Sequence, residues 1–150
     1  MEHLKDLINL LKLVEQNLPE IMTKTAQVIS NDAIALASSE IREQGFGEMY
    51  LNEYYKEYRQ ELGHQIAFVD LTLTGKMWQG VIPSDVIVEG TKYYCTLSHT
   101  NQEGADKFNW NYERYGDFVG KVLTGKNLEY LGDTAYEEIT KRIDKIIGDE

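Results

Sequence analysis

The first 44 residues carry apolar positions at helical spacing. Over residues 3–18, apolar residues recur at helical intervals while charged residues take the other side, which predicts an amphipathic helix. Asn17 followed by Pro19 predicts a break, because proline suits the first turn of a new helix. A second helix is predicted over residues 19–44, ended by Gly45. It would be roughly 40 Å long, which for a small domain favours packing on another subunit.

The next segment, residues 48–62, is rich in tyrosine. Its tyrosines are spaced by three and four residues, which predicts a short helix with an aromatic side. Burial of these rings against the core is the simpler interpretation, and contact with a protein or sugar is the alternative. Tyr54 and Tyr58 are the candidate contact residues in this segment.

Residues 71–88 join the helical half of the chain to the region whose pattern is typical of a sheet. Asp70 is placed to cap a short helical turn over residues 74–79, bounded by glycines. We expect this turn to orient the long helix against the sheet, with a large apolar side chain buried. The residues of this structural turn are Thr74, Gly75, Met77 and Trp78.

A β-hairpin follows the turn. An apolar β-branched run begins at Val81, is interrupted at Pro83 and resumes over residues 86–88. Residues 89–91 form a glycine-containing turn signal, and residues 92–98 are predicted to be one returning strand. Because proline cannot donate to a strand ladder, Pro83 predicts a bulge, an edge or the start of the strand.

The pattern is ambiguous over residues 99–120, which are polar and rich in glycine and aromatic residues. Phe108 and Tyr112 fit either a strand or a helix, so periodicity does not decide between them. We predict a long loop, and long loops often contact a partner. The candidate interface residues here are Trp110, Tyr112, Tyr115 and Phe118.

The last element is a predicted C-terminal helix. Thr134 and Glu137 match a capping box that would start it. Its apolar face would be made by Tyr136, Ile139, Ile143, Ile146 and Ile147.

These elements predict an α+β fold, in which long N-terminal helices and a C-terminal helix pack on a small antiparallel sheet containing a β-hairpin. The chain of 150 residues is expected to form a single domain. Its predicted parts are a helical segment (1–45), a Tyr-rich connection (46–69), a turn plus hairpin (70–98), a long loop region (99–131) and the C-terminal helix (132–150).

Composition narrows the classes of function. A net charge of −10 argues against wrapping a nucleic-acid backbone, although it is compatible with lining a passage through which DNA slides. The single cysteine, Cys95, fits a reducing compartment and is expected to be a small buried residue. No stretch is apolar enough to predict a membrane span or a signal peptide, so a soluble intracellular protein is expected.

Catalytic and metal-binding patterns are largely missing from the sequence. The three histidines have no second ligand at metal-binding spacing, and no phosphate-binding or dinucleotide-binding motif occurs. We therefore expect no cofactor, no metal and no enzymatic activity. The alternative is a small hydrolase or sugar-binding module that uses His99, Glu103 and Trp110.

Three short motifs carry a resemblance to a known family. Residues 74–81, TGKMWQGV, resemble the T-G-x-L-x-x-S-I turn of tailed-phage tail-completion proteins, also called head–tail joining or virion-morphogenesis proteins. Residues 94–99, YCTLSH, with Gly104 are similar to the second strand of that family, Y-A-x-x-H-x-x-G. Residues 114–120, RYGDFVG, are similar to its R-x-F-h-G element before the final helix.

The resemblance implies a non-enzymatic structural protein of the virion. Such a protein would form a homo-oligomeric ring at the neck, and would contact connector or portal-side proteins on one side and tail proteins on the other. DNA would pass through the ring without being bound specifically. The protein would be made in the host cytoplasm and assembled at the head–tail junction. A second alternative is a cytoplasmic adaptor that binds other proteins through the face over Tyr50–Tyr58.

Overall fold

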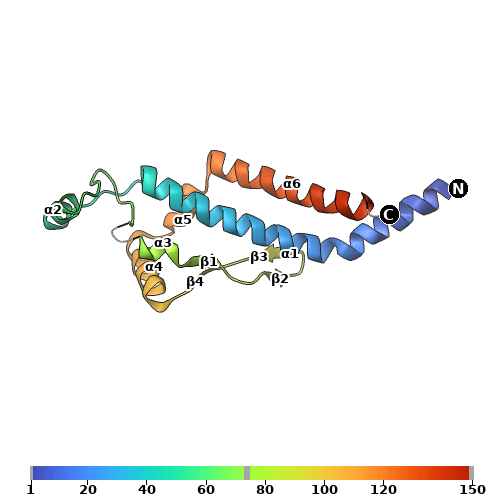
Figure 1. The fold of residues 1–150 in the computed structure, drawn as a ribbon, viewed down its shortest axis with the longest axis horizontal. Coiled ribbons are helices and arrows are strands. Elements are labelled where there is room, and N and C mark those ends of the chain that lie inside the picture. The colour runs from blue at the N-terminus through green and yellow to red at the C-terminus, as the bar shows by residue number, and fades with distance from the viewer. Residues whose placement is uncertain (1, 73–74, 149–150) are drawn as a thin grey trace.

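A computed structural model describes residues 2–72 and 75–148 of the chain. The molecule is elongated, and the long helix α1 (Glu2–Gln44) runs along it (Figure 1). The C-terminal helix α6 (Gly125–Gly148) packs along one side of α1, and the short strands lie on the other side. The helix α2 (Glu53–Glu61) projects at one end, opposite the N-terminus of α1. The predicted α+β class is confirmed: long N-terminal helix, packed C-terminal helix and small antiparallel sheets.

The helix α1 is continuous, so the predicted break at Pro19 is wrong. Proline removes the hydrogen bond to the carbonyl four residues earlier, which here belongs to Glu15. Glu15 and Pro19 are both exposed, so water can hydrogen-bond to that carbonyl. The side chain of Asn17 donates to the carbonyl of Leu13 at 2.8 Å instead of ending the helix. The predicted end at Gly45 is confirmed, because Gly45 has a φ of +73°.

The helix α2 lies inside the segment where a short helix was predicted. It begins after Asn52, whose Oδ1 accepts a hydrogen bond from the Tyr55 N–H at 3.0 Å. Further on, the predicted cap at Asp70 is wrong. The short helix α3 (Lys76–Gln79) begins after Gly75, which has a φ of +72°, and Asp70 belongs to a buried ion pair described below.

Four short strands form the predicted hairpin. The strands β1 (Val81–Pro83) and β4 (Leu97–His99) pair antiparallel, as do β2 (Ile87–Glu89) and β3 (Lys92–Tyr94). The returning strand is interrupted between β3 and β4, at half-buried Cys95 and exposed Thr96, rather than continuous as predicted. Thr96 still exchanges two hydrogen bonds with Ser84 across this gap, at 2.8 and 2.9 Å. Pro83 is the last residue of β1.

The predicted long loop is instead mostly helical. The helix α4 (Gln102–Tyr115) begins after Asn101, whose Oδ1 accepts from the Gly104 N–H at 2.7 Å. It ends at Tyr115, and the next residue, Gly116, has a φ of +73°. A short helix α5 (Phe118–Val122) follows. Capping at both ends of α4 therefore decides the ambiguity that the periodicity left open.

The helix α6 begins at Gly125, so the predicted start at Thr134 is also wrong. The hydroxyl of Thr134 donates to the carbonyl of Tyr130 at 2.9 Å, as it does in the interior of a helix. Tyr136 is 73% exposed and does not belong to the packed face. The inner face of α6 instead includes buried Leu131 and half-buried Ile139 and Ile143.

The core lies between α1 and the elements α3, β1, α4 and α5. Its centre is aromatic: the ring of Phe118 lies 5.0 Å from that of Phe108 and 6.1 Å from that of Trp78, centroid to centroid. Such edge-to-face and tilted pairs stabilise beyond the area they bury. Trp78 therefore links the turn to α4 and α5. The buried cluster consists of Ala37, Ile41, Met77, Trp78, Val81, Phe108, Phe118 and Val122.

Candidate partner-binding cleft

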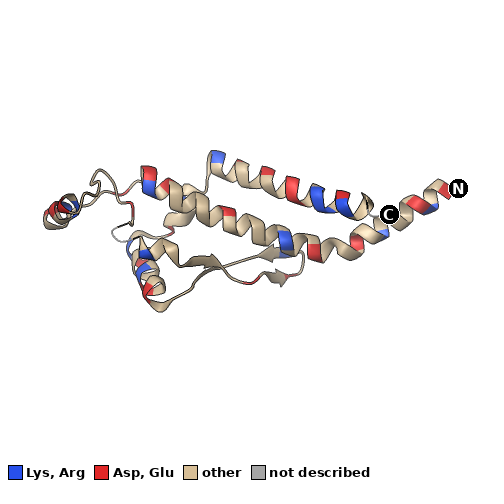
Figure 2. Cartoon of the chain, in the orientation of Figure 1, with Lys and Arg blue, Asp and Glu red and all other residues tan. Residues whose placement is uncertain are grey.

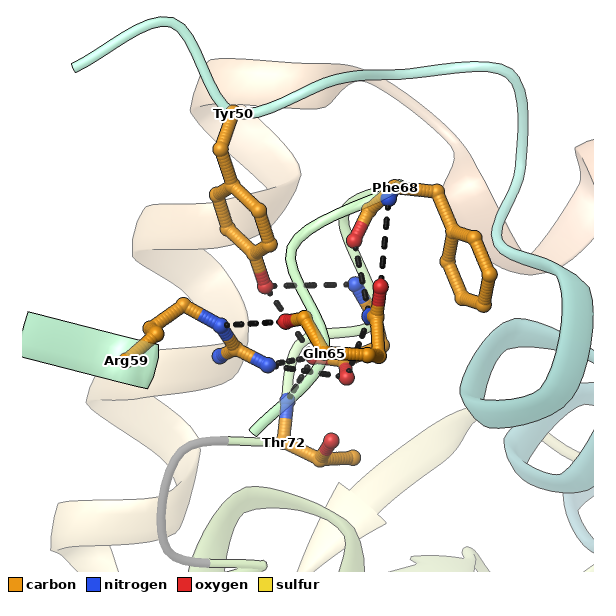
Figure 3. Close-up of polar contacts among 6 residues, drawn as sticks. Tyr50, Arg59, Gln65, Phe68 and Thr72 are labelled. Carbon is orange, nitrogen blue, oxygen red and sulfur yellow. Dashed lines mark hydrogen bonds and ion pairs between the residues drawn. The ribbon is translucent and has the colours of Figure 1, made fainter. Parts of the chain in front are cut away.

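A buried polar network holds α2 against the rest of the molecule (Figure 3). Arg59 Nη2 donates to both carboxylate oxygens of Asp70 at 2.9 Å, and Tyr50 Oη donates to one of them at 3.0 Å. Gln65 Nε2 donates to the other oxygen at 2.7 Å, and the Thr72 N–H also donates to Asp70, at 3.0 Å. Arg59 is fully buried and Asp70 is 4% exposed. The carboxylate therefore collects donors from four separate points of the chain.

The electrostatics of this network depend on the ionised carboxylate. Burial pushes the pKa of Asp70 upward, but the hydrogen bonds from Gln65 and Thr72 and the charge of Arg59 outweigh it and hold the pKa below its ordinary value. Burial also raises the pKa of Tyr50, which keeps its hydroxyl a donor. The Arg59 guanidinium lies 4.6 Å from the centroid of the Tyr50 ring. Removing either charge would leave the other buried without a partner.

Beside this network lies a cleft of about 700 Å³, which we call the α2–α4 cleft. One wall is the segment from Glu48 to Asn52 with Tyr55 of α2, and the other wall is α4. The floor includes Val69 and Met77, which are buried. Its volume is in the range of roughly 300–1,000 Å³ that is usual for ligand sites.

The wall on α4 is aromatic and basic. It is made by side chains at helical spacing, Lys107, Trp110, Asn111 and Arg114. The Arg114 guanidinium lies 5.4 Å from the ring centroid of Trp110 and also 5.4 Å from that of Tyr115. Trp110 remains 59% exposed. A flat aromatic side chain with a stacked cation is typical of the anchors found at protein interfaces.

The α2–α4 cleft combines a few charged side chains with apolar surface. Its charged lining residues are Glu48, Lys107 and Arg114, and the described lining contains no histidine or cysteine. Glu48 lies 3.7 Å from Lys121 and Lys107 lies 2.8 Å from Glu103, so among the described residues Arg114 is the charged lining residue without an ion pair. Apolar surface remains open at its mouth, where Met49 is 63% and Leu51 86% exposed. The arrangement suits an apolar partner segment with acidic flanks.

The structure places the residues predicted as an interface in four different surroundings. Tyr54 and Tyr58 lie on the exposed side of α2. Trp110 is on the wall of the cleft, and Tyr112 is exposed elsewhere on α4. Phe118 is fully buried in the core, so the prediction that it contacts a partner is wrong.

Tyr115 lines the cleft, and its ring centroid lies 5.5 Å from that of Phe46. In the structural turn, Met77 and Trp78 are buried and Gly75 directly precedes α3, while Thr74 lies outside the described residues.

The alternative catalytic set does not converge. The ring centroid of His99 lies 5.1 Å from that of Phe108, and His99 is not among the residues that line the cleft. Its Nε2 is buried with no hydrogen-bond partner among the described residues. Glu103 is exposed and paired with Lys107 at 2.8 Å. Trp110 lines the α2–α4 cleft, which contains neither of the other two. These positions weigh against a shared active site.

Two further observations concern metal binding and membrane crossing. Within residues 2–72 and 75–148, no group of three or more His, Cys, Asp or Glu side chains is placed to hold a metal ion. In the same part of the chain, no helix combines the length and the hydropathy that crossing a membrane requires.

Sequence reasoning missed the Arg59–Asp70 pair and the basic wall of the cleft. Arg59 sits among exposed tyrosines and glutamates in the sequence, so nothing in the local pattern marks it as buried. Lys107 and Arg114 are seven residues apart, which is a signal only once α4 is known to be a helix. No protein-family model, curated protein or solved structure matches this chain.

Proposed function

We propose that this chain is a structural protein of a tailed-phage virion. It forms a ring at the head–tail junction and joins the connector side of the head to the tail. The support is the resemblance of the turn over residues 74–81, together with the order of elements: a long helix, a turn, a hairpin and a final helix. The observation that carries the proposal furthest is the exposed apolar surface at both ends of an elongated subunit.

A subunit of a ring meets its two neighbours through two different surfaces. At one end of this molecule Leu51 and Tyr54 are 86% and 85% exposed. At the other end Leu4 and Leu11 of α1 are 58% and 61% exposed. Contiguous exposed apolar surface of this kind marks contact sites. Charge is mixed along α1 and α6 in Figure 2, so neither of these two helices forms a basic track for DNA.

The proposal is tested on particles. Phage that lack the gene for this chain should accumulate DNA-filled heads and separate tails, visible by electron microscopy, and the plasmid-borne gene should restore joined particles. Antibody against the chain should label the neck of intact particles. Normal assembly without the chain, or its absence from purified virions, would refute the proposal. Recovery of the chain only in complexes with cytoplasmic host proteins would favour an adaptor.

A further inference from the structure

The N-terminal part of α1 carries an apolar stripe without a partner. Residues 4, 7, 11, 14 and 18 follow a heptad pattern that continues into Ile21 and Thr25. Ile21 and Thr25 are buried, at 3% and 4% exposed, whereas the positions before them are exposed apart from half-buried Val14. One face of one helix is therefore packed in its second half and open in its first. We call its exposed part the α1 stripe: Leu4, Leu7, Ile8, Leu11 and Leu18, each 41–61% exposed.

The α1 stripe has no counterpart to cover it within the described chain. The helix α6, which packs along α1, leaves the N-terminal part of α1 projecting beyond it (Figure 1). The other open apolar surface, at the α2–α4 cleft, lies at the opposite end of the molecule. Since α1 is one continuous helix from Glu2 to Gln44, its N-terminus cannot fold back to that cleft. Any contact between the two surfaces must join two molecules.

We propose that the α1 stripe of one copy docks in the α2–α4 cleft of the next copy. This inference rests on the proposed ring function and names the two surfaces that form its repeated contact. An amphipathic helix binds a groove through anchors spaced i, i+3 and i+7, and Leu4, Leu7 and Leu11 have this spacing. The cleft offers an apolar floor, the open side chain of Leu51 and the indole of Trp110.

The charges of the two surfaces are of opposite sign. Residues 2–18 contain three acids and two bases, a net charge of −1 with histidine neutral. The cleft lining contains two bases and one acid, a net charge of +1, and one of the bases, Lys107, is paired with Glu103 outside the lining. Asp6 directly precedes Leu7, and Arg114 forms no ion pair among the described residues. Complementary charge of this kind fixes the register of a contact whose affinity comes from apolar surface.

The contact joins different surfaces on each copy, so it repeats from one molecule to the next. Such a heterologous contact generates a closed ring or an open filament, depending on the rotation between neighbours. Pairing of two α1 stripes would instead stop at a two-fold dimer. The proposal therefore predicts assemblies that grow beyond two copies.

The test uses two full-length variants that each lose one surface. Leu7→Asp with Leu11→Asp blocks the α1 stripe, and Leu51→Asp with Trp110→Glu blocks the cleft. All four side chains are at least 52% exposed, so the fold should survive, which circular dichroism checks. The matched control replaces two equally exposed apolar side chains of α6, Leu128→Asp with Tyr136→Asp.

Sedimentation velocity over a wide concentration range gives the outcome. The unaltered chain and the α6 control should assemble beyond dimers, and each blocked variant should remain monomeric. An equimolar mixture of the two blocked variants should form a heterodimer and nothing larger, because one stripe and one cleft remain intact. A monomeric unaltered chain, self-assembly of either blocked variant, or a mixture that stays monomeric would overturn the proposal.

These results are independent of the function test. A chain that assembles through this contact but is absent from phage necks leaves the interface standing and refutes the proposed function. A chain found in necks whose blocked variants still assemble refutes only the interface.

Discussion

The core beside α1 and the α2 end of the molecule are held by different forces. Around Trp78 and Phe118, side chains from several elements pack as apolar and aromatic contacts. At α2, one buried ion pair between Arg59 and Asp70 fixes the helix, while Tyr54 on its outer side is 85% exposed. The polar network, together with the Tyr55 ring that lies 5.4 Å from the Tyr50 ring, centroid to centroid, positions α2 and leaves Tyr54 and Tyr58 exposed. The α2 end is therefore held in place while its outer aromatic face remains available to a partner.

The largest expected effect comes from removing the aromatic centre of the core. Trp78→Ala should lower the free energy of unfolding by about 3–5 kcal/mol, because it leaves a cavity against Phe108 and Phe118. Denaturant unfolding measures the change. Trp110→Ala is the matched control, since Trp110 is 59% exposed and should lose less than about 1 kcal/mol. Equal losses for the two tryptophans would contradict the position of the core.

Breaking the polar network should have the next largest effect. Asp70→Asn leaves the Arg59 charge buried without a counter-charge, and should destabilise by about 3 kcal/mol. Hydrogen exchange should show that amide protection is lost first in α2 and only weakly in the core. In Trp78→Ala, by contrast, protection should be lost in the core. Adding Arg59→Met should recover much of the stability, since removing both charges leaves no unpaired ion. No recovery in the double variant would show that packing of the arginine stem dominates.

The connection between the two regions offers a smaller effect. Gly45 and Gly47 both have positive φ, +73° and +91°. A Cβ on Gly45 would lie 2.8 Å from the Phe68 ring, whereas a Cβ on Gly47 would meet nothing within 4 Å. Gly45→Ala should therefore cost about 2–3 kcal/mol and Gly47→Ala about 1 kcal/mol, measured by thermal unfolding. Equal costs would mean that Phe68 moves aside freely.

The smallest effect is a dependence of stability on pH that belongs to the α2 end. The pKa of Asp70 is lower in the folded than in the unfolded chain, so the unfolded state binds more protons as the pH falls. The stability that the network contributes is fully present above the ordinary pKa of aspartate. It is lost as the pH falls through the lowered pKa that Asp70 has in the folded chain. Unfolding measured between neutral and acidic pH should show a shallower dependence in Asp70→Asn than in the unaltered chain. An unchanged slope would contradict the lowered pKa.

The sequence predicts elements well where one signal is strong. The end of α1, the position of α2 and the hairpin turn followed from glycine, tyrosine spacing and β-branched runs, and all three are present. The helix α4 was missed because Phe108 and Tyr112 fit two periods equally, and the deciding signals were the cap at Asn101 and the stop at Gly116. Short-range capping chemistry carried more information there than periodicity.

Other features depend on the tertiary structure and had no local signal. Pro19 is tolerated inside α1 because Pro19 and Glu15, whose carbonyl loses its intrahelical partner, are both exposed to solvent. The Arg59–Asp70 pair spans 11 residues and forms only because the loop between them folds back under α2. The cleft joins segments more than 50 residues apart, from Glu48 to Tyr115, so its composition could not be read along the chain.

Hydrogen–deuterium exchange of the unaltered chain at low and at high concentration tests the central claim, that copies meet end to end through the α1 stripe and the α2–α4 cleft. Assembly should slow exchange in two places, residues 2–18 and the walls of the cleft including the outer face of α4. Exchange around Phe118, which is already buried, should stay the same. Protection that appears at residues 2–18 alone, or along α6 instead, would contradict the claim.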